Sequence, residues 1–248
     1  MSGLWPIFKR ELFSLFVTPL AWVLGTAFLL LQGMHFYLIV SHFAAQSEIA
    51  ADAGPVETFF GQTVLLYLPL LFVCPVLTMR LFAEERRSGM IEPLLTAPVS
   101  TVGVVLGKYL AVLTTYCAMW APTVLYMVLA DRFGAVDWRV VGSGYLAVVG
   151  IGAGCLGIGT LTSALSKSQL AAAVLSAMAI LGLFMFGLGE FVFDEGAAHD
   201  LAAYVSVWAQ MNDFSRGIVD SRRLLFDATL VVLPLFITVR AVDAWRSE

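Results

Sequence analysis

A block of four consecutive charged residues, Glu84-Glu85-Arg86-Arg87, interrupts an apolar stretch near the centre of the chain. The apolar run before it extends to Leu81, and the run after it starts at Val102 and contains Lys108 as its only charge up to residue 130. Each charge at bilayer depth costs several kcal/mol, so the block is expected to lie in water. There its carboxylates and guanidinium groups can form charge-assisted hydrogen bonds with a partner.

The residues after this block predict a short amphipathic helix. Its apolar positions fall at helical spacings on one face, namely Met90, Ile91, Leu94 and Leu95. Ser88 is a candidate N-cap, Glu92 follows within a turn, and Pro98 is a candidate stop. Two interpretations are open: a segment that docks on an aqueous partner, and a plain loop whose helix lies on lipid headgroups.

Two glycine-containing patterns suggest phosphate binding, but neither has the required context. In the run 103–109 the gap is one residue too short, and Tyr109 stands where Ser or Thr must contact the metal. The Gly-x-Gly-x-x-Gly spacing at Gly152 falls inside an apolar run long enough to span a membrane, not after a strand. We therefore predict no nucleotide hydrolysis by this chain.

The histidines do not form a metal or catalytic site. His35, His42 and His199 are scattered, with no two at metal-ligand spacing on one helix. Gln32 and His35 lie within an apolar run, where polar side chains commonly hydrogen-bond a neighbouring helix. No nucleophile-elbow motif is present. We predict no catalytic residue, no metal site and no cofactor bound by this chain.

The composition is that of a membrane protein. Of the 248 residues, 60% are hydrophobic and 13% charged, whereas soluble proteins are about half apolar and a quarter charged. We predict one all-α transmembrane domain over residues 1–248, with six spans at about 20–43, 61–81, 102–130, 140–165, 169–193 and 224–242. Gly150 and Gly154 stand four apart in the fourth span, which predicts close helix packing there.

Residues 4–16 predict an amphipathic helix that is too charged to span the membrane, because Lys9, Arg10 and Glu11 interrupt its apolar face. Pro19 then bends the chain into the first span, as in an elbow. Most of the Lys and Arg residues, including Lys9, Arg10 and the central block, fall on one side of the six predicted spans. That side is predicted to be cytoplasmic, with both termini on it.

The central run resembles the cytoplasmic loop of ABC type-2 transporter permeases. The likeness lies in the run 84–89, Glu92, the runs 94–96 and 98–100, and Gly107-Lys108. In that family this loop contains a short coupling helix that docks into a groove on a separate ATPase subunit. Pro93 departs from the family pattern, because a proline beyond the first turn breaks a helix; it favours a helix that begins at Pro93.

The resemblance extends over nearly the whole chain. Residues 213–223, which lead into the sixth span, resemble the gliding-motility-associated subfamily of these permeases. The resemblance to ABC type-2 permeases implies a docking loop formed by Glu84, Glu85, Arg86, Arg87, Ser88, Gly89, Met90, Glu92, Leu94 and Leu95. It also implies a non-catalytic permease in the bacterial inner membrane, ATP and Mg on a partner ATPase, and a second permease chain. An auxiliary envelope protein and membrane lipid are further expected partners, and nucleic acid is not.

The resemblance also implies a mechanical role. The second span is expected to continue helically through 81–86 into water, so that movement of the coupling helix tilts the span. Glu84 and Glu85 would face basic groups on the ATPase. Arg86 and Arg87 would pair with acids there or, alternatively, anchor the loop at the membrane surface.

Two rival functions are weighed against the permease. One is a membrane scaffold that recruits an ATPase into an envelope machine without moving a substrate. The other is a polytopic membrane enzyme, which the sequence argues against because no span contains an acid, a histidine pair or a nucleophile motif.

Overall fold

The computed structural model describes residues 3–45, 54–61, 63–89, 99–134, 136–193 and 196–247, and no strand occurs among them. Six stretches are long and apolar enough to cross a membrane. This confirms an all-α, polytopic membrane protein. The predicted coupling helix, which includes Met90, Glu92, Leu94 and Leu95, lies outside the described residues.

The described chain forms helices in the following order: α1 (Leu4–Val17), α2 (Pro19–Ala45), α3 (Pro55–Gly61), η1 (Val64–Leu66), α4 (Leu68–Thr78), α5 (Ala83–Ser88), α7 (Thr101–Trp120), η2 (Ala121–Thr123), α8 (Val124–Phe133), α9 (Trp138–Leu165), α10 (Gln169–Gly187), η3 (Leu188–Phe191), α11 (Ala197–Val205), α12 (Val207–Ser215) and α13 (Ser221–Ser247).

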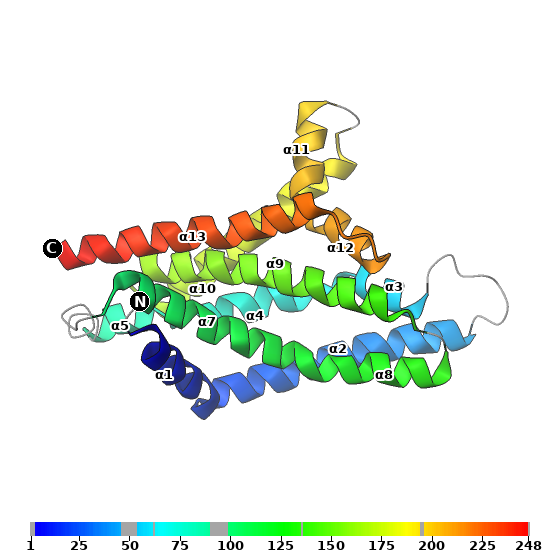
Figure 1. The fold of residues 1–248 in the computed structure, drawn as a ribbon, viewed down its shortest axis with the longest axis horizontal. Coiled ribbons are helices and arrows are strands. Elements are labelled where there is room, and N and C mark those ends of the chain that lie inside the picture. Colours follow the sequence, from blue (N-terminus) through cyan, green and yellow to red (C-terminus); the bar gives the residue numbers. More distant parts are fainter. Residues whose placement is uncertain are drawn as a thin grey trace.

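The long helices run side by side along one axis, and the short ones gather at the two ends (Figure 1). Helix α1, helix α5 and the last turns of α13 lie at one end, which we call the terminal end. The short helices α3, α11 and α12 lie toward the other, and α11 projects away from the bundle there. Helix α9 contacts α4, α7, α10, α12 and α13, and so forms the centre of the fold.

Glycines let neighbouring helices approach α9 closely. A Cβ atom added at Gly154 would lie 2.9 Å from Cβ of Leu230 on α13, and one added at Gly150 would collide with the Asp227 carboxylate. On another face of α9, Tyr109 and Tyr116 of α7 donate hydrogen bonds to backbone carbonyls at 3.0 and 3.1 Å. Several helices therefore pack directly against the α9 backbone.

Two of the six spans are interrupted. The second contains η1 and α4, and Thr63 just before η1 is hydrogen-bonded to His35 of α2. His35 thus joins neighbouring segments, as expected from its place in an apolar run. The third span changes from α7 to α8 through η2, which contains Pro122, because proline cannot donate the helical hydrogen bond at that position.

Side chains of α13 hold the short helices at the far end. Arg223 donates hydrogen bonds to the carbonyls of Ala203, at 2.6 Å, and Tyr204, at 3.2 Å, near the end of α11. One turn later, buried Asp227 accepts a hydrogen bond of 2.7 Å from Gln210 of α12. The prediction that no span contains an acid is therefore wrong, since Asp227 lies within the sixth. Its amide partner gives it a role in joining α13 to α12.

The packing of α9 against α13 can be tested with alanine. Gly154→Ala places a methyl group too close to Leu230, whereas Gly142 of the same helix has no atom within 4 Å of an added Cβ. We expect Gly154→Ala to lower the free energy of unfolding by about 1–3 kcal/mol and Gly142→Ala to leave it unchanged or higher. Thermal unfolding in detergent measures both; equal unfolding temperatures would contradict the packing.

Candidate functional site

The helix of the second span stops before the central charged block. Helix α4 ends at Thr78 and α5 begins at Ala83. In the turn between them, the amides of Phe82 and Ala83 donate hydrogen bonds to Oγ of Ser163 on α9, at 3.1 and 3.3 Å. The Ser163 hydroxyl in turn donates to the Met79 carbonyl at 3.2 Å. The prediction of continuous helix from 81 to 86 is therefore wrong, because a side chain from α9 replaces the missing helical partners.

Lys108 supports the same turn from the opposite side. Its side chain is only 1% exposed, and its ammonium donates a hydrogen bond of 2.8 Å to the carbonyl of Leu81. It also pairs with Glu85 Oε1 at 2.9 Å and with Glu11 Oε1 at 3.1 Å. Glu11 belongs to α1, which we call the elbow helix. A buried ammonium is stable only when it is paired and hydrogen-bonded. Here one ammonium joins α7, the turn, α5 and α1.

Arg10 adds a second cation to this cluster. Its guanidinium contacts Glu11 Oε1 at 2.6 Å and Glu85 Oε1 at 3.1 Å. Two carboxylates and two cations thus balance one another at the contact of α1 with α5. We call Arg10, Glu11, Glu85 and Lys108 the junction cluster.

The cluster shifts the pKa of its elbow-helix members. Burial alone raises the pKa of Glu11, but the positive charges of Lys108 and Arg10, and the hydrogen bonds they donate, lower it overall below its ordinary value of 4.5. Burial lowers the pKa of Arg10, and the carboxylates of Glu11 and Glu85 outweigh that effect and raise it. Both groups are therefore held in their charged forms.

Arg86 connects α5 to two more helices. Its guanidinium donates a hydrogen bond of 3.0 Å to the carbonyl of Ala164 on α9. The same group lies 4.4 Å from the ring centroid of Trp245, near the end of α13. Among the described residues, the contacts of Arg86 are a carbonyl and an indole ring. Its pairing with an acid or with headgroups stays a prediction.

The other face of α5 remains exposed. Arg87, Ser88 and Gly89 are exposed, and Glu84 keeps 45% of its side chain accessible while it pairs with Arg80 at 2.9 Å. Ser88 is the last residue of α5, and its hydroxyl donates to the Glu84 carbonyl at 2.9 Å. The helix that Ser88 was predicted to cap lies outside the described residues. Gly89 follows with a φ of 70°, a left-handed conformation that favours glycine.

A polar cavity of about 330 Å³ lies beside the junction cluster. The cluster's four members line it, together with Ser14, Arg80, Leu81, Glu84 and Ser88. The second oxygen of Glu85, Oε2, is buried and accepts no hydrogen bond from the described residues.

Sequence patterns indicate the charged block of α5 but not the residues that hold it. No pattern pointed to the contacts of Glu11, Ser163 and Trp245, and Lys108 stood out only as part of a family pattern. A lone lysine in an apolar run is a usable signal, because such a charge needs an acidic partner. Among the described residues, no group of three or more His, Cys, Asp or Glu side chains could hold a metal ion.

Comparison with known protein families finds one family that matches most of the chain. The family model described as "ABC-2 family transporter protein" matches residues 40–231, which is more than half of the chain. The match includes α5, Lys108 and Ser163, whereas the elbow helix and Trp245 lie outside it. No curated protein matches the chain.

Removal of the central ammonium should destabilise the terminal end. Lys108→Met leaves Glu11 and Glu85 without their buried cation and the Leu81 carbonyl without its donor. We expect a loss of about 3–5 kcal/mol in the free energy of unfolding. Lys167→Met, at an exposed lysine that follows α9, is the matched control and should cost little. Equal thermal stability of the two variants in detergent would contradict the cluster.

The depressed pKa of Glu11 predicts a dependence on pH. Its stabilising contribution is fully present above its unfolded pKa, near 4.5, and is lost as the pH falls through its lower folded pKa. Wild type should therefore be more stable than Glu11→Gln at neutral pH, and the difference should shrink as the pH is lowered below 4.5. Melting temperatures over that range measure it; a constant difference would show that the charge of Glu11 contributes nothing.

Proposed function

We propose that this chain, which belongs to the ABC-2 family of transporter proteins, is a permease subunit that couples ATP hydrolysis by a separate ATPase subunit to export or mechanical work. The chain is a multi-pass membrane protein. In the proposal, ATP and Mg are bound by the partner ATPase, and the permease works with a second permease chain. The observation that carries the proposal is an exposed charged segment, α5, tied by buried contacts to four transmembrane or elbow helices.

The contacts of α5 divide its residues into two groups. Glu85 and Arg86 are engaged within the chain, by the junction cluster and by α9 and α13. They position the segment. Glu84, Arg87, Ser88 and Gly89 face outward and, with the segment that follows them, form the docking surface for the ATPase.

The transmission path follows from the same contacts. A displacement of α5 acts on α1 and α7 through the junction cluster, and on α9 through Ser163 and Arg86. Because the turn at 79–82 separates α5 from α4, a displacement of α5 is not transmitted along one straight helix. It is transmitted to several helices, and the central helix α9 transmits it to α10 and α13.

The proposed orientation places the terminal end in the cytoplasm of a bacterial cell, with the chain in the inner membrane. Lys and Arg are abundant at that end of the bundle, because α1 contains Lys9 and Arg10, α5 contains Arg86 and Arg87, and Arg80 lies in the turn before α5. An excess of Lys and Arg marks the cytoplasmic side of membrane proteins. The same orientation makes α5 accessible to a cytoplasmic ATPase.

The likeness of residues 213–223 to gliding-motility-associated permeases supports mechanical work as one form of the activity. In the structure this segment comprises the last residues of α12, the turn after it and the first residues of α13. A scaffold that recruits an ATPase without moving a substrate is the alternative function. It shares the docking surface, and it differs in the absence of transport.

Docking is tested by co-purification in detergent with the candidate ATPase, followed by an assay of ATPase activity. The double reversal Glu84→Arg/Arg87→Glu changes the outward face of α5 and leaves the junction cluster intact. We expect it to reduce ATPase recovery at least about tenfold, since like charges at an interface cost several kcal/mol. The control reversal Asp131→Arg/Arg132→Glu, at exposed positions of the far end, should leave recovery unchanged.

The results separate the alternatives. Loss of recovery only in the α5 reversal supports docking there, and transport in reconstituted vesicles then distinguishes the permease from the scaffold. Equal recovery from the two double variants would overturn the docking surface. If wild type recovers no ATPase, the proposal itself fails.

A further inference from the structure

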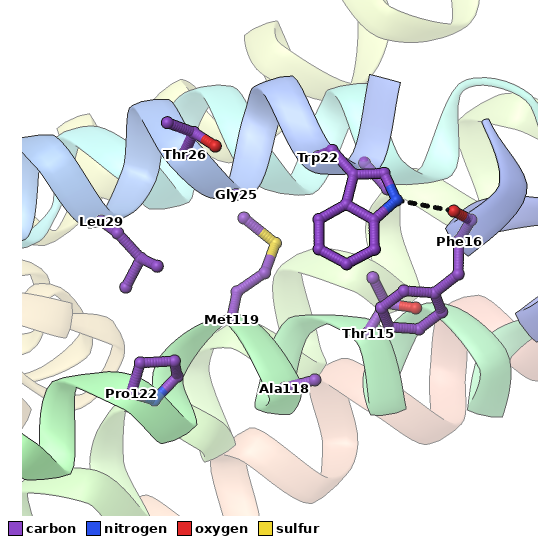
Figure 2. Close-up of a pocket in the computed structure, with 10 residues that line it drawn as sticks. Phe16, Trp22, Gly25, Thr26, Leu29, Thr115, Ala118, Met119 and Pro122 are labelled. Atoms are coloured by element: carbon purple, nitrogen blue, oxygen red, sulfur yellow. Dashed lines mark hydrogen bonds between the residues drawn. The ribbon is translucent and has the colours of Figure 1, made fainter. Parts of the chain in front are cut away.

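An apolar crevice lies between α2 and α7, next to the end of the elbow helix (Figure 2). It has a volume of about 260 Å³. Gly25, Thr26 and Leu29 line it from α2, and Thr115, Ala118 and Met119 line it from α7, with Phe16, Ala21, Trp22 and Pro122 completing the wall. Figure 2 shows Trp22 and Phe16 side by side at one end of the crevice, with Met119 between the two helices.

The crevice offers little hydrogen-bonding capacity to a ligand. The indole N–H of Trp22 already donates to the carbonyl of Phe16 at 2.8 Å, and the Thr115 hydroxyl donates to the carbonyl of Ala111 at 2.9 Å. The remaining wall is largely hydrocarbon and glycine. An apolar chain fits this chemistry, whereas a polar solute would lose its hydration without replacement.

An open groove with an almost wholly apolar wall lies beside the crevice, along the elbow helix α1. Lys9, Arg10, Leu12, Phe13 and Phe16 line this open groove on the outer face of α1. Phe16 belongs to both the groove and the crevice. The guanidinium of Arg10 is already balanced by Glu11 and Glu85. The charge offered to a ligand therefore comes from Lys9, whose exposed ammonium lies 5.2 Å from the ring centroid of Trp5.

We propose that the groove and the crevice together bind one bilayer phospholipid with an anionic headgroup. Its phosphate lies at Lys9, and one acyl chain passes Phe16 and enters the crevice between α2 and α7. The site is distinct from the α5 docking surface and does not depend on an ATPase.

Three observations favour a lipid as the occupant. The crevice lies between two membrane-spanning helices, where hydrocarbon chains are the surrounding solvent. Its volume is below the roughly 300–1,000 Å³ of pockets that enclose a whole organic ligand, so it holds part of a longer chain. Finally, a cation at the end of an apolar groove matches the order of headgroup and acyl chain in an anionic lipid.

The test measures lipid retained by the full-length chain, purified in mild detergent and exposed to an equal mixture of phosphatidylglycerol and phosphatidylcholine. Native mass spectrometry counts the lipids bound. Gly25→Leu fills the crevice, and the substitution has room because no atom lies within 4 Å of an added Cβ. Gly182→Leu is its matched control, since Gly182 is an equally open glycine on the exposed surface of α10. Lys9→Gln and Lys167→Gln form the corresponding charge pair.

We expect wild type and the two control variants to retain one phosphatidylglycerol. Gly25→Leu should reduce the amount of bound phosphatidylglycerol about tenfold. This is the effect expected when roughly two methylene groups of the acyl chain are excluded from the crevice. Lys9→Gln should reduce the preference for phosphatidylglycerol over phosphatidylcholine about fivefold, the effect of one basic residue near the membrane surface.

Equal retention by Gly25→Leu and Gly182→Leu would overturn the crevice as a lipid site. An unchanged headgroup preference in Lys9→Gln would overturn the anionic site even if the crevice holds a chain. A wild-type chain that carries no lipid, but pairs with a second copy in a way that Gly25→Leu disrupts, would assign the crevice to that copy and refute the proposal.

Discussion

The terminal end of this protein depends on one buried ammonium. Lys108 lies in the third span with 1% of its side chain exposed, and its three donors reach the Leu81 carbonyl, Glu11 and Glu85. A lone lysine at that depth would be costly, and it is stable because these acceptors converge on it. They come from three separate segments. The need to neutralise one charge therefore determines where the elbow helix, the turn after α4 and α5 meet.

The rest of the fold supplies the rigid frame that this meeting point requires. Ser163 of α9 binds the other side of the turn, and α9 itself is held against α13 through glycines that leave no room for side chains. An exposed segment that touched only the membrane surface would need none of these contacts. Their presence supports a segment that receives force from outside and passes it to the bundle.

Sequence patterns predicted the broad architecture because that part depends on composition. Runs of apolar residues predict spans, and the spacing of apolar and charged positions in residues 4–16 predicts a helix, which the structure has as α1. The break at 79–82 was not predicted, since no glycine or proline lies in it. It is stabilised by Ser163 and Lys108, which are distant in sequence. The contacts of Glu85 and Arg86 within the chain could not be predicted for the same reason. They are made with helices distant in sequence, so the sequence alone does not distinguish these two residues from Glu84 and Arg87.

The junction cluster should hold α1 and α5 together as one rigid unit. Spin labels at Phe13→Cys and Ser88→Cys, both at exposed positions, report the distance between these helices in nanodiscs, after Cys117 is replaced by alanine. Pulsed electron paramagnetic resonance should give one narrow distance distribution that broadens when Lys108→Met is added. A broad distribution in the protein with Lys108 intact, or no change on its removal, would contradict the account.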